Sequence, residues 1–187
     1  WSLEQAKIQT TQDPPLAGHV AVISGGAGAI GAATAQAFFD EGAAIVLLDL
    51  NIGLAEEIAA SMGGLSIACD ITDAASVNAT FDTICKTYGG VDILVSNAGA
   101  AWQGKIGEVD EAVLRQSFEL NFFGHQNVAK AAVAIMTRQG TGGSLLFNAS
   151  KQAVNPGPNF GPYGLPKAAT LSLMRQYAVD YGDQGIR

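Results

Sequence analysis

The stretch His19–Gly31 reads HVAVISGGAGAIG, and it sets the interpretation of the whole chain. Its first six residues are apolar and β-branched, which is typical of a buried strand. Its second half places Gly26, Gly28 and Gly31 in the pattern G-x-G-x-x-G. An Ala-rich segment follows directly, and it predicts a helix that ends near Glu41. The stretch therefore predicts a strand, a tight glycine turn and a helix.

This strand–turn–helix unit indicates a site for the pyrophosphate of a dinucleotide. A bound pyrophosphate must touch backbone N–H groups at the helix N-terminus, and Cβ atoms would hold it off. A purely structural turn is the alternative, because the chain contains 23 glycines. Residues 20–39 carry no charge and are long enough to cross a membrane, but the glycine turn explains them better. We expect a cytoplasmic protein.

Working outward from the turn, further apolar runs alternate with helical segments. Continuous apolar strands of this kind, separated by helices, indicate a parallel sheet covered on both faces. We predict a doubly wound, three-layer α/β/α Rossmann fold over residues 16–187, with residues 1–15 as a linker or N-terminal extension. Further strands are expected at 44–49, 65–69, 92–96 and 144–148, and further helices at 54–62, 73–88, 110–138 with one break or bend, and 161–181.

The charge balance excludes two classes of partner. The chain has 17 acidic and 10 basic side chains, for a formal net charge of −7. A nucleic-acid surface needs clustered Lys and Arg, and so does binding to an anionic membrane surface. His19 and His125 have no second histidine or cysteine at ligand spacing, so we expect no metal site.

Asp49 ends the second predicted strand, 18 residues after Gly31. A carboxylate at that place accepts hydrogen bonds from the ribose hydroxyls of a bound dinucleotide, although a turn or capping role is the alternative. Between Lys7 and Lys86 there is no Lys or Arg, whereas nine Asp or Glu occur. The 2′-phosphate of NADP would find no cation there. We therefore predict NAD as the cofactor.

Two more strand ends supply candidate contacts. Asp70 and Ile71 follow the third strand, either beside the adenine or as part of a helix cap formed by the neighbouring Thr72 or Asp73. Asn97-Ala98-Gly99 follows the fourth strand, at the sheet edge where ligands bind in such folds.

Tyr163 and Lys167 stand four residues apart at the start of the last helix, which places both on one face. A free tyrosine titrates near 10, and a nearby cation lowers that pKa. Such a tyrosine can take a proton from an alcohol as hydride leaves, or return it to a carbonyl. Ser150, 13 residues earlier, is placed to hold the substrate oxygen. A chance pair and an ordinary strand-end serine are the alternatives.

Together these residues resemble the classical short-chain dehydrogenases/reductases, from Leu16 to Arg187. The resemblance implies that Tyr163 is the catalytic acid/base and that Lys167 lowers its pKa and binds the nicotinamide ribose. It also implies that Ser150 positions the substrate oxygen and that Asn121 holds a water of the proton relay. The cofactor-binding set that follows is Gly25, Gly26, Gly28, Ile30, Gly31, Asp49, Asp70, Ile71, Asn97, Ala98, Gly99, Tyr163 and Lys167.

The chain departs from the family pattern in two ways. Ala29 and Ser24 stand where the family usually has Gly and Thr. The family also continues after the last helix with a strand, a substrate lid and another strand, so we expect the domain at 16–187 to be C-terminally incomplete. The resemblance further implies a homo-oligomer, dimer or tetramer, formed through the long helix and the last helix. Trp102, Gln152, Asn155 and Phe160 are candidate substrate contacts.

A narrower resemblance concerns residues 1–7 (WSLEQAK) and 150–167. Both are similar to the dehydrogenase half of bifunctional rhamnulose-1-phosphate aldolase/dehydrogenases. This implies an upstream aldolase domain, rhamnose catabolism and a small polar substrate such as lactaldehyde. Two other functions stay open. One is a cofactor-retaining epimerase or dehydratase, because Gly25, Gly28 and Gly31 fit its G-x-x-G-x-x-G turn. The other is a non-catalytic dinucleotide-binding module.

Overall fold

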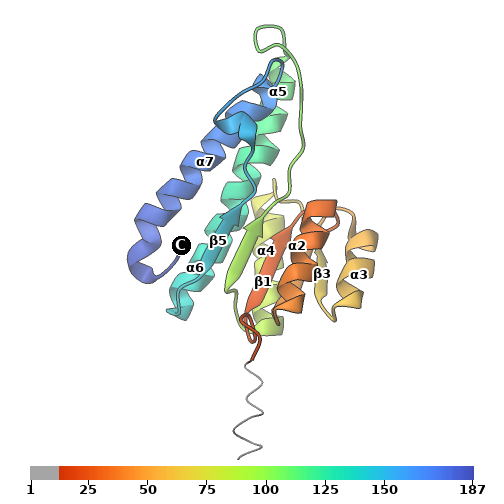
Figure 1. Cartoon of the computed structure of the whole chain (residues 1–187), viewed down its shortest axis with the longest axis vertical. Coiled ribbons are helices and arrows are strands. Elements are labelled where there is room, and N and C mark those ends of the chain that lie inside the picture. Colours follow the sequence, from red (N-terminus) through yellow and green to blue (C-terminus); the bar gives the residue numbers. More distant parts are fainter. Residues whose placement is uncertain (1–12) are drawn as a thin grey trace, which may run out of the picture.

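The computed structural model describes residues 13–187, which form a parallel five-stranded sheet with helices on both faces (Figure 1). The strands lie in the order β3-β2-β1-β4-β5, and every neighbouring pair is parallel. The order reverses between β1 and β4, which places a ligand-binding crevice at the carboxyl ends of these strands. The strands are β1 Val20–Ser24, β2 Ala44–Asp49, β3 Leu65–Ala68, β4 Ile93–Ser96 and β5 Ser144–Phe147.

The helices confirm the predicted alternation. They are α2 Ala29–Asp40, α3 Ile52–Ser61, α4 Ala74–Tyr88, α5 Glu111–Phe118, α6 Gly124–Gln139 and α7 Gly161–Tyr181. The bend expected within 110–138 is a π-helical segment, Glu119–Phe123, that joins α5 to α6. Helix α3 begins two residues earlier than expected, because the Asn51 side chain caps it by accepting the N–H of Leu54.

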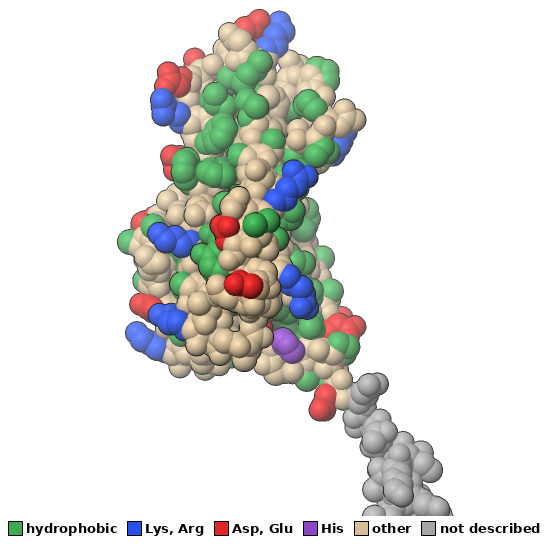
Figure 2. Space-filling model, turned by 90° about the vertical axis from the view of Figure 1, so that its left-hand side faces the viewer, with side chains coloured by type: hydrophobic (Ala, Val, Ile, Leu, Met, Phe, Trp, Pro, Cys, Tyr) green, Lys and Arg blue, Asp and Glu red, His purple; other side chains and the backbone are tan. Residues whose placement is uncertain are grey.

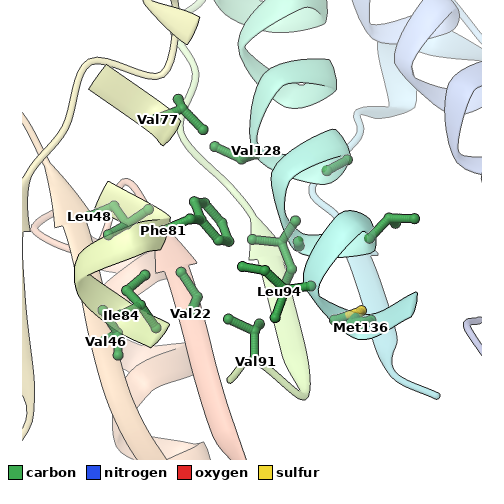
Figure 3. Packing of buried hydrophobic residues seen from close by; sticks show 14 of the residues in the cluster. Val22, Val46, Leu48, Val77, Phe81, Ile84, Val91, Leu94, Val128 and Met136 are labelled. Atoms are coloured by element: carbon green, nitrogen blue, oxygen red, sulfur yellow. The ribbon is translucent and has the colours of Figure 1, made fainter. Parts of the chain in front are cut away.

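Alternate residues of the strands enter two separate cores. In β1, Val20 and Val22 pack with α4 and α6 on one face, and Ala21 and Ile23 pack with α2 and α3 on the other. Figure 3 shows Val22 and Leu94 meeting Phe81 on the first of these faces. Helix α7 joins the same face through Tyr177. The predicted doubly wound α/β fold is confirmed, and both covered faces explain why the strands read as uninterrupted apolar runs.

The sheet ends at β5, whose outer edge is partly paired. Leu145 donates its N–H to the carbonyl of Arg187 at 2.7 Å, and Arg187 donates to Gly143 at 3.0 Å. Leu146 lies on the side opposite to the α4/α6 core and is 44% exposed. The additional strands expected after α7 stay a prediction. So does the linker at residues 1–15, most of which lies outside the described residues.

No helix within residues 13–187 is long and apolar enough to span a bilayer. The uncharged stretch 20–39 forms β1, the glycine turn and most of α2. Its lack of charge therefore reflects a buried strand followed by a close backbone turn.

Candidate functional site

A cavity of about 680 Å³ lies at the carboxyl end of the sheet. It is lined by the glycine turn, the residues that follow β2, β3 and β4, and the first turns of α7, and its volume suits an organic ligand. Segments far apart in the sequence therefore meet around one space. The lining includes these predicted site residues: Gly25, Gly28, Ile30, Asp49, Asp70, Ile71, Asn97, Ala98, Gly99, Tyr163 and Lys167.

The glycine turn is held against β2 by its backbone. Gly25 and Gly26 donate their N–H groups to the Leu48 carbonyl at 2.8 and 3.2 Å. A Cβ at Gly31 would collide with the carbonyl oxygen of Gly25, and one at Gly26 would lie 2.8 Å from the Cβ of Leu47. These two glycines lie beneath the turn and allow the close approach, whereas Gly28 borders the cavity.

Helix α2 begins directly after Gly28, so its first N–H groups have no intrahelical acceptor. Its first turn contains no acidic side chain, and Gly28, Ala29 and Ile30 line the cavity there. This helix end can therefore receive an anion such as a pyrophosphate.

Asp49 connects two structural elements at the cavity wall. Its Oδ2 accepts the N–H of Ala27 at 2.9 Å, and its Oδ1 accepts the N–H of Asn51 at 2.9 Å. The carboxylate is therefore fixed between the glycine turn and the start of α3, and each oxygen keeps acceptor capacity for a ligand hydroxyl. Within residues 13–187, Lys167 is the only basic side chain that lines the cavity.

The helix cap considered near Asp70 falls on Asp73, and a contact between Asp70 and the adenine stays a prediction. Asp73 caps α4 by accepting the N–H of Ala75 at 2.9 Å. Asp70 instead accepts the N–H and the hydroxyl of Thr72, at 2.9 and 2.7 Å, and lines the cavity together with Ile71.

Asn97 and Ser24 tie the ends of β4 and β1 together. Asn97 donates its side-chain amide to the carbonyls of Ser24 and Gly25, at 3.1 and 3.2 Å. The Ser24 hydroxyl accepts the N–H groups of Asn97 and Ala98. Ser24, at the family's Thr position, thus holds the end of β4 against the end of β1. A cofactor contact from Asn97 stays a prediction.

Tyr163 and Lys167 both border the cavity from the first turns of α7. Lys167 is only 2% exposed, and its Nζ donates to the Asn148 carbonyl at 2.8 Å. The Nζ lies 5.9 Å from the centre of the Tyr163 ring. Burial lowers the pKa of Lys167 to about 8. Near neutral pH the amine is therefore charged, and the cavity holds a positive charge on the same helix face as Tyr163.

Asn121 lies in the π-helical segment and is fully buried. Its Nδ2 donates to the Ala100 carbonyl at 2.8 Å, but its Oδ1 has no partner among the described residues. A Cβ at Gly99 would lie 2.8 Å from that Oδ1 and 3.3 Å from the Nζ of Lys167. An unpaired buried acceptor in this position is suited to a bound water. π-Helical turns inside helices occur frequently at functional sites.

Ser150 and the four substrate candidates do not line the cavity. The Ser150 hydroxyl accepts the N–H of Gln152 at 3.2 Å and caps a short 3₁₀ turn. Gln152 in turn accepts the N–H of Gly157. Phe160 immediately precedes α7 without a side-chain capping bond, Asn155 is exposed and Trp102 is half-buried. Substrate contacts from these five residues stay predictions.

One polar residue of the site escaped the sequence analysis. His125, which looked isolated, is fully buried and contacts both Lys167 and Ser96. Its partners lie 29 and 42 residues away in the chain, so no local sequence pattern predicts these contacts. In the part of the chain that the structure describes, no group of His, Cys, Asp and Glu could hold a metal ion.

The fold and the glycine turn define a Rossmann-type dinucleotide-binding domain with a Tyr–Lys pair at its cavity. Sequence comparison gives the family. A family model described as enoyl-(acyl carrier protein) reductase matches residues 25–187. The (-)-isopiperitenol/(-)-carveol dehydrogenase of Mentha piperita is 35% identical, over 92% of this chain and 67% of its own length. The chain belongs to the short-chain dehydrogenase/reductase family.

Two further similarities bear on the extent of the match. The uncharacterized oxidoreductase YuxG of Bacillus subtilis is 34% identical, over 100% of this chain but 28% of its own length. The crystal structure of NAD+-bound xylitol dehydrogenase has a TM-score of 0.88 and 31% identity, and the match covers 92% of this chain and 68% of that one. The chain therefore spans about two thirds of the plant relative and of the solved structure, and less than a third of YuxG.

Proposed function

We propose that this chain carries the cofactor site and the catalytic side chains of an NAD-dependent oxidoreductase that interconverts an alcohol and a carbonyl. The observation that carries the proposal is the shared cavity, where Tyr163 and the buried Lys167 border the same space as the glycine turn and Asp49. A phosphate-binding turn alone would serve any dinucleotide module, but a cation beside a tyrosine supplies a proton-transfer group.

The choice of NAD rests on Asp49. Both carboxylate oxygens are oriented by backbone N–H groups, at 2.9 Å each. Leu50 and Asn51, which follow Asp49 in the cavity wall, carry no positive charge. A 2′-phosphate at this place would lie against a fixed carboxylate without a cation to pair with it. The similarity to an NAD+-bound xylitol dehydrogenase agrees with this choice.

The glycine turn, which has no room for a Cβ at Gly26 or Gly31, fits a bound nicotinamide dinucleotide. The Asn121 Oδ1, which has no partner among residues 13–187, fits an associated water. Bound NAD supplies the hydride acceptor. The deprotonated Tyr163, whose negative charge the Lys167 ammonium balances, takes the proton of the substrate hydroxyl and becomes a neutral phenol. The Asn121 Oδ1 holds the relay water, and Ser150 orients the substrate oxygen. Lys167 also keeps a donor for the nicotinamide ribose.

The substrate class follows from the resemblance and the xylitol dehydrogenase similarity, and we place it among small polar alcohols, hydroxy-aldehydes and sugar derivatives, for example lactaldehyde. An upstream aldolase domain and a place in rhamnose catabolism belong to the same proposal. Cleavage of rhamnulose-1-phosphate by the full-length protein, together with oxidation of lactaldehyde, tests both. Absence of the cleavage, with good turnover of another alcohol, would remove them.

The proposed function is tested by NADH formation in the purified protein with a panel of small polyols and hydroxy-aldehydes. Tyr163→Phe should lower turnover by about 10²–10⁴-fold, because the acid/base group is removed, while NAD binding is retained. Tyr181→Phe is the matched control, since Tyr181 lies on the same helix but outside the cavity lining. An epimerase or dehydratase would turn over substrate without net NADH, and a binding module would show NAD binding alone.

A further inference from the structure

A chain of three buried polar side chains lies behind the cavity. Ser96 at the end of β4 and His125 on α6 are 0% exposed, and Lys167 on α7 is 2% exposed. The Ser96 Oγ lies 2.6 Å from the His125 Nδ1. The His125 Nε2 lies 3.1 Å from the Lys167 Nζ. The imidazole therefore connects the central sheet to the amine of the proposed catalytic pair.

The charge states of Lys167 and His125 determine where the hydrogens lie between these three side chains. Burial, and then the charge of Lys167, lowers the pKa of His125 to about 3, so the imidazole is neutral. A neutral imidazole has one donor and one acceptor nitrogen, whereas an ammonium group only donates. Lys167 consequently donates to Nε2, and the proton of the ring lies on Nδ1, which donates to Ser96.

The hydrogen-bonded series of Ser96, His125 and Lys167 ends inside the protein at Ser96, so it does not conduct protons. Ser96 is fully buried in β4, between β1 and β5. The groups that face the imidazole are Ser96 of β4, Phe147 of β5, whose ring centre lies 6.3 Å away, and Lys167 of α7. Of these three groups, Lys167 alone carries a charge. The electrostatic effect of His125 is therefore on the Lys167 amine.

We propose that His125 is a positioning residue that anchors the Lys167 amine and supports its charged form, with Ser96 selecting the ring tautomer. The proposal rests on the function proposed for Lys167. The ammonium has three donors; His125 and the Asn148 carbonyl take two of them, which leaves one for the cavity. Without the imidazole, a buried ammonium would lose an acceptor and the freedom of the side chain would increase.

The first test needs no variant, cofactor or substrate. Nitrogen-15 NMR of histidine-labelled protein reports which ring nitrogen of His125 carries the proton. We expect the proton on Nδ1 and a neutral ring throughout the neutral pH range. A proton on Nε2 would overturn the proposal, because that nitrogen then could not accept from Lys167.

The second test follows the titration of Lys167 through its ε-carbon in lysine-labelled protein. His125→Phe removes both ring contacts, and His125→Asn retains only an acceptor near Nδ1. Each should lower the Lys167 midpoint by about one pH unit or more, because an acceptor of the charged form is lost. His125→Gln, which can place an oxygen near Nε2, should bring the Lys167 midpoint most of the way back to that of the unmodified protein. His19→Gln, at an exposed histidine, is the control.

Equal Lys167 midpoints in all folded variants would overturn the proposal, and denaturant unfolding of each variant establishes that it is folded. In the active protein, the same order of variants should appear in kcat, with NAD binding little changed. The titration separates the positioning role of His125 from the proposed oxidoreductase function. A shifted midpoint in a protein without turnover would contradict the proposed function alone, whereas an unshifted midpoint in an active protein would contradict only the positioning role.

Discussion

Lys167 is a charged side chain in a buried environment that disfavours its charge. The buried amine has a pKa of about 8, against an ordinary value of 10.5, because burial disfavours its charged form. Between these two values the unfolded chain holds a proton that the folded chain has released. The stability contributed by this group therefore rises with pH through that window, and its burial is most unfavourable below it.

This gives a prediction for Lys167→Met. Relative to the variant, the free energy of unfolding of the unmodified protein should rise between pH 8 and 10.5. The slope should reach about 1.4 kcal/mol per pH unit, the value for a difference of one proton. Denaturant unfolding at several pH values measures it. Lys151→Met, at an exposed lysine, is the control for the loss of a surface ammonium. A flat difference for Lys167→Met would contradict the pKa of Lys167.

At the scale of elements, the turn before α2 depends on backbone contact. The absence of a side chain at Gly31 lets that residue lie directly against the Gly25 carbonyl. Gly31→Ala should weaken NAD binding and lower the free energy of unfolding by about 1–3 kcal/mol, because overpacking forces the backbone apart. Titration and denaturant unfolding measure the two effects.

Gly53→Ala provides the matched control for that prediction. Gly53 lies in α3, and an added Cβ there would meet nothing within 4 Å. The substitution should raise the free energy of unfolding by about 0.5–1 kcal/mol, because alanine is the better helix former. Equal effects of the two substitutions would show that contact at the turn is unimportant.

The sequence was sufficient for elements whose signals are local. The five strands read as apolar runs, with β1 and β4 buried throughout, and α7 begins at Gly161 and ends at Tyr181 as expected. The π-helical segment could not be located, because residues 119–123 contain no proline or glycine to mark it. His125 was missed for a different reason: its contacts form only when α6 packs against β4 and α7.

At the scale of the molecule, the surface on the α7 side is a candidate self-association face. Leu165 and Val179 of α7 are 47% and 77% exposed, and Phe123 of the π-helical segment is 45% exposed. Figure 2 shows hydrophobic side chains gathered in the upper part of this side of the molecule. The long and last helices are also those through which the family resemblance implies a homo-oligomer.

We predict that Val179→Glu shifts the protein toward smaller species, because a charge placed in an apolar interface must be desolvated. Analytical ultracentrifugation at several concentrations measures this. Val154→Glu, which is 70% exposed in the loop before α7, is the control and should leave the distribution unchanged. A monomeric protein, or equal effects of the two variants, would contradict an interface at Val179.

The most direct test of the central claim is a calorimetric titration of the protein with NAD and with NADP, repeated with Asp49→Asn. NAD should bind saturably, and NADP should bind at least about tenfold more weakly, a difference of about 1.4 kcal/mol. Asp49→Asn should weaken NAD binding and narrow the difference, because the ribose loses a charged acceptor and the 2′-phosphate loses a repelling charge. Tighter binding of NADP than of NAD by the unmodified protein would contradict the role assigned to Asp49.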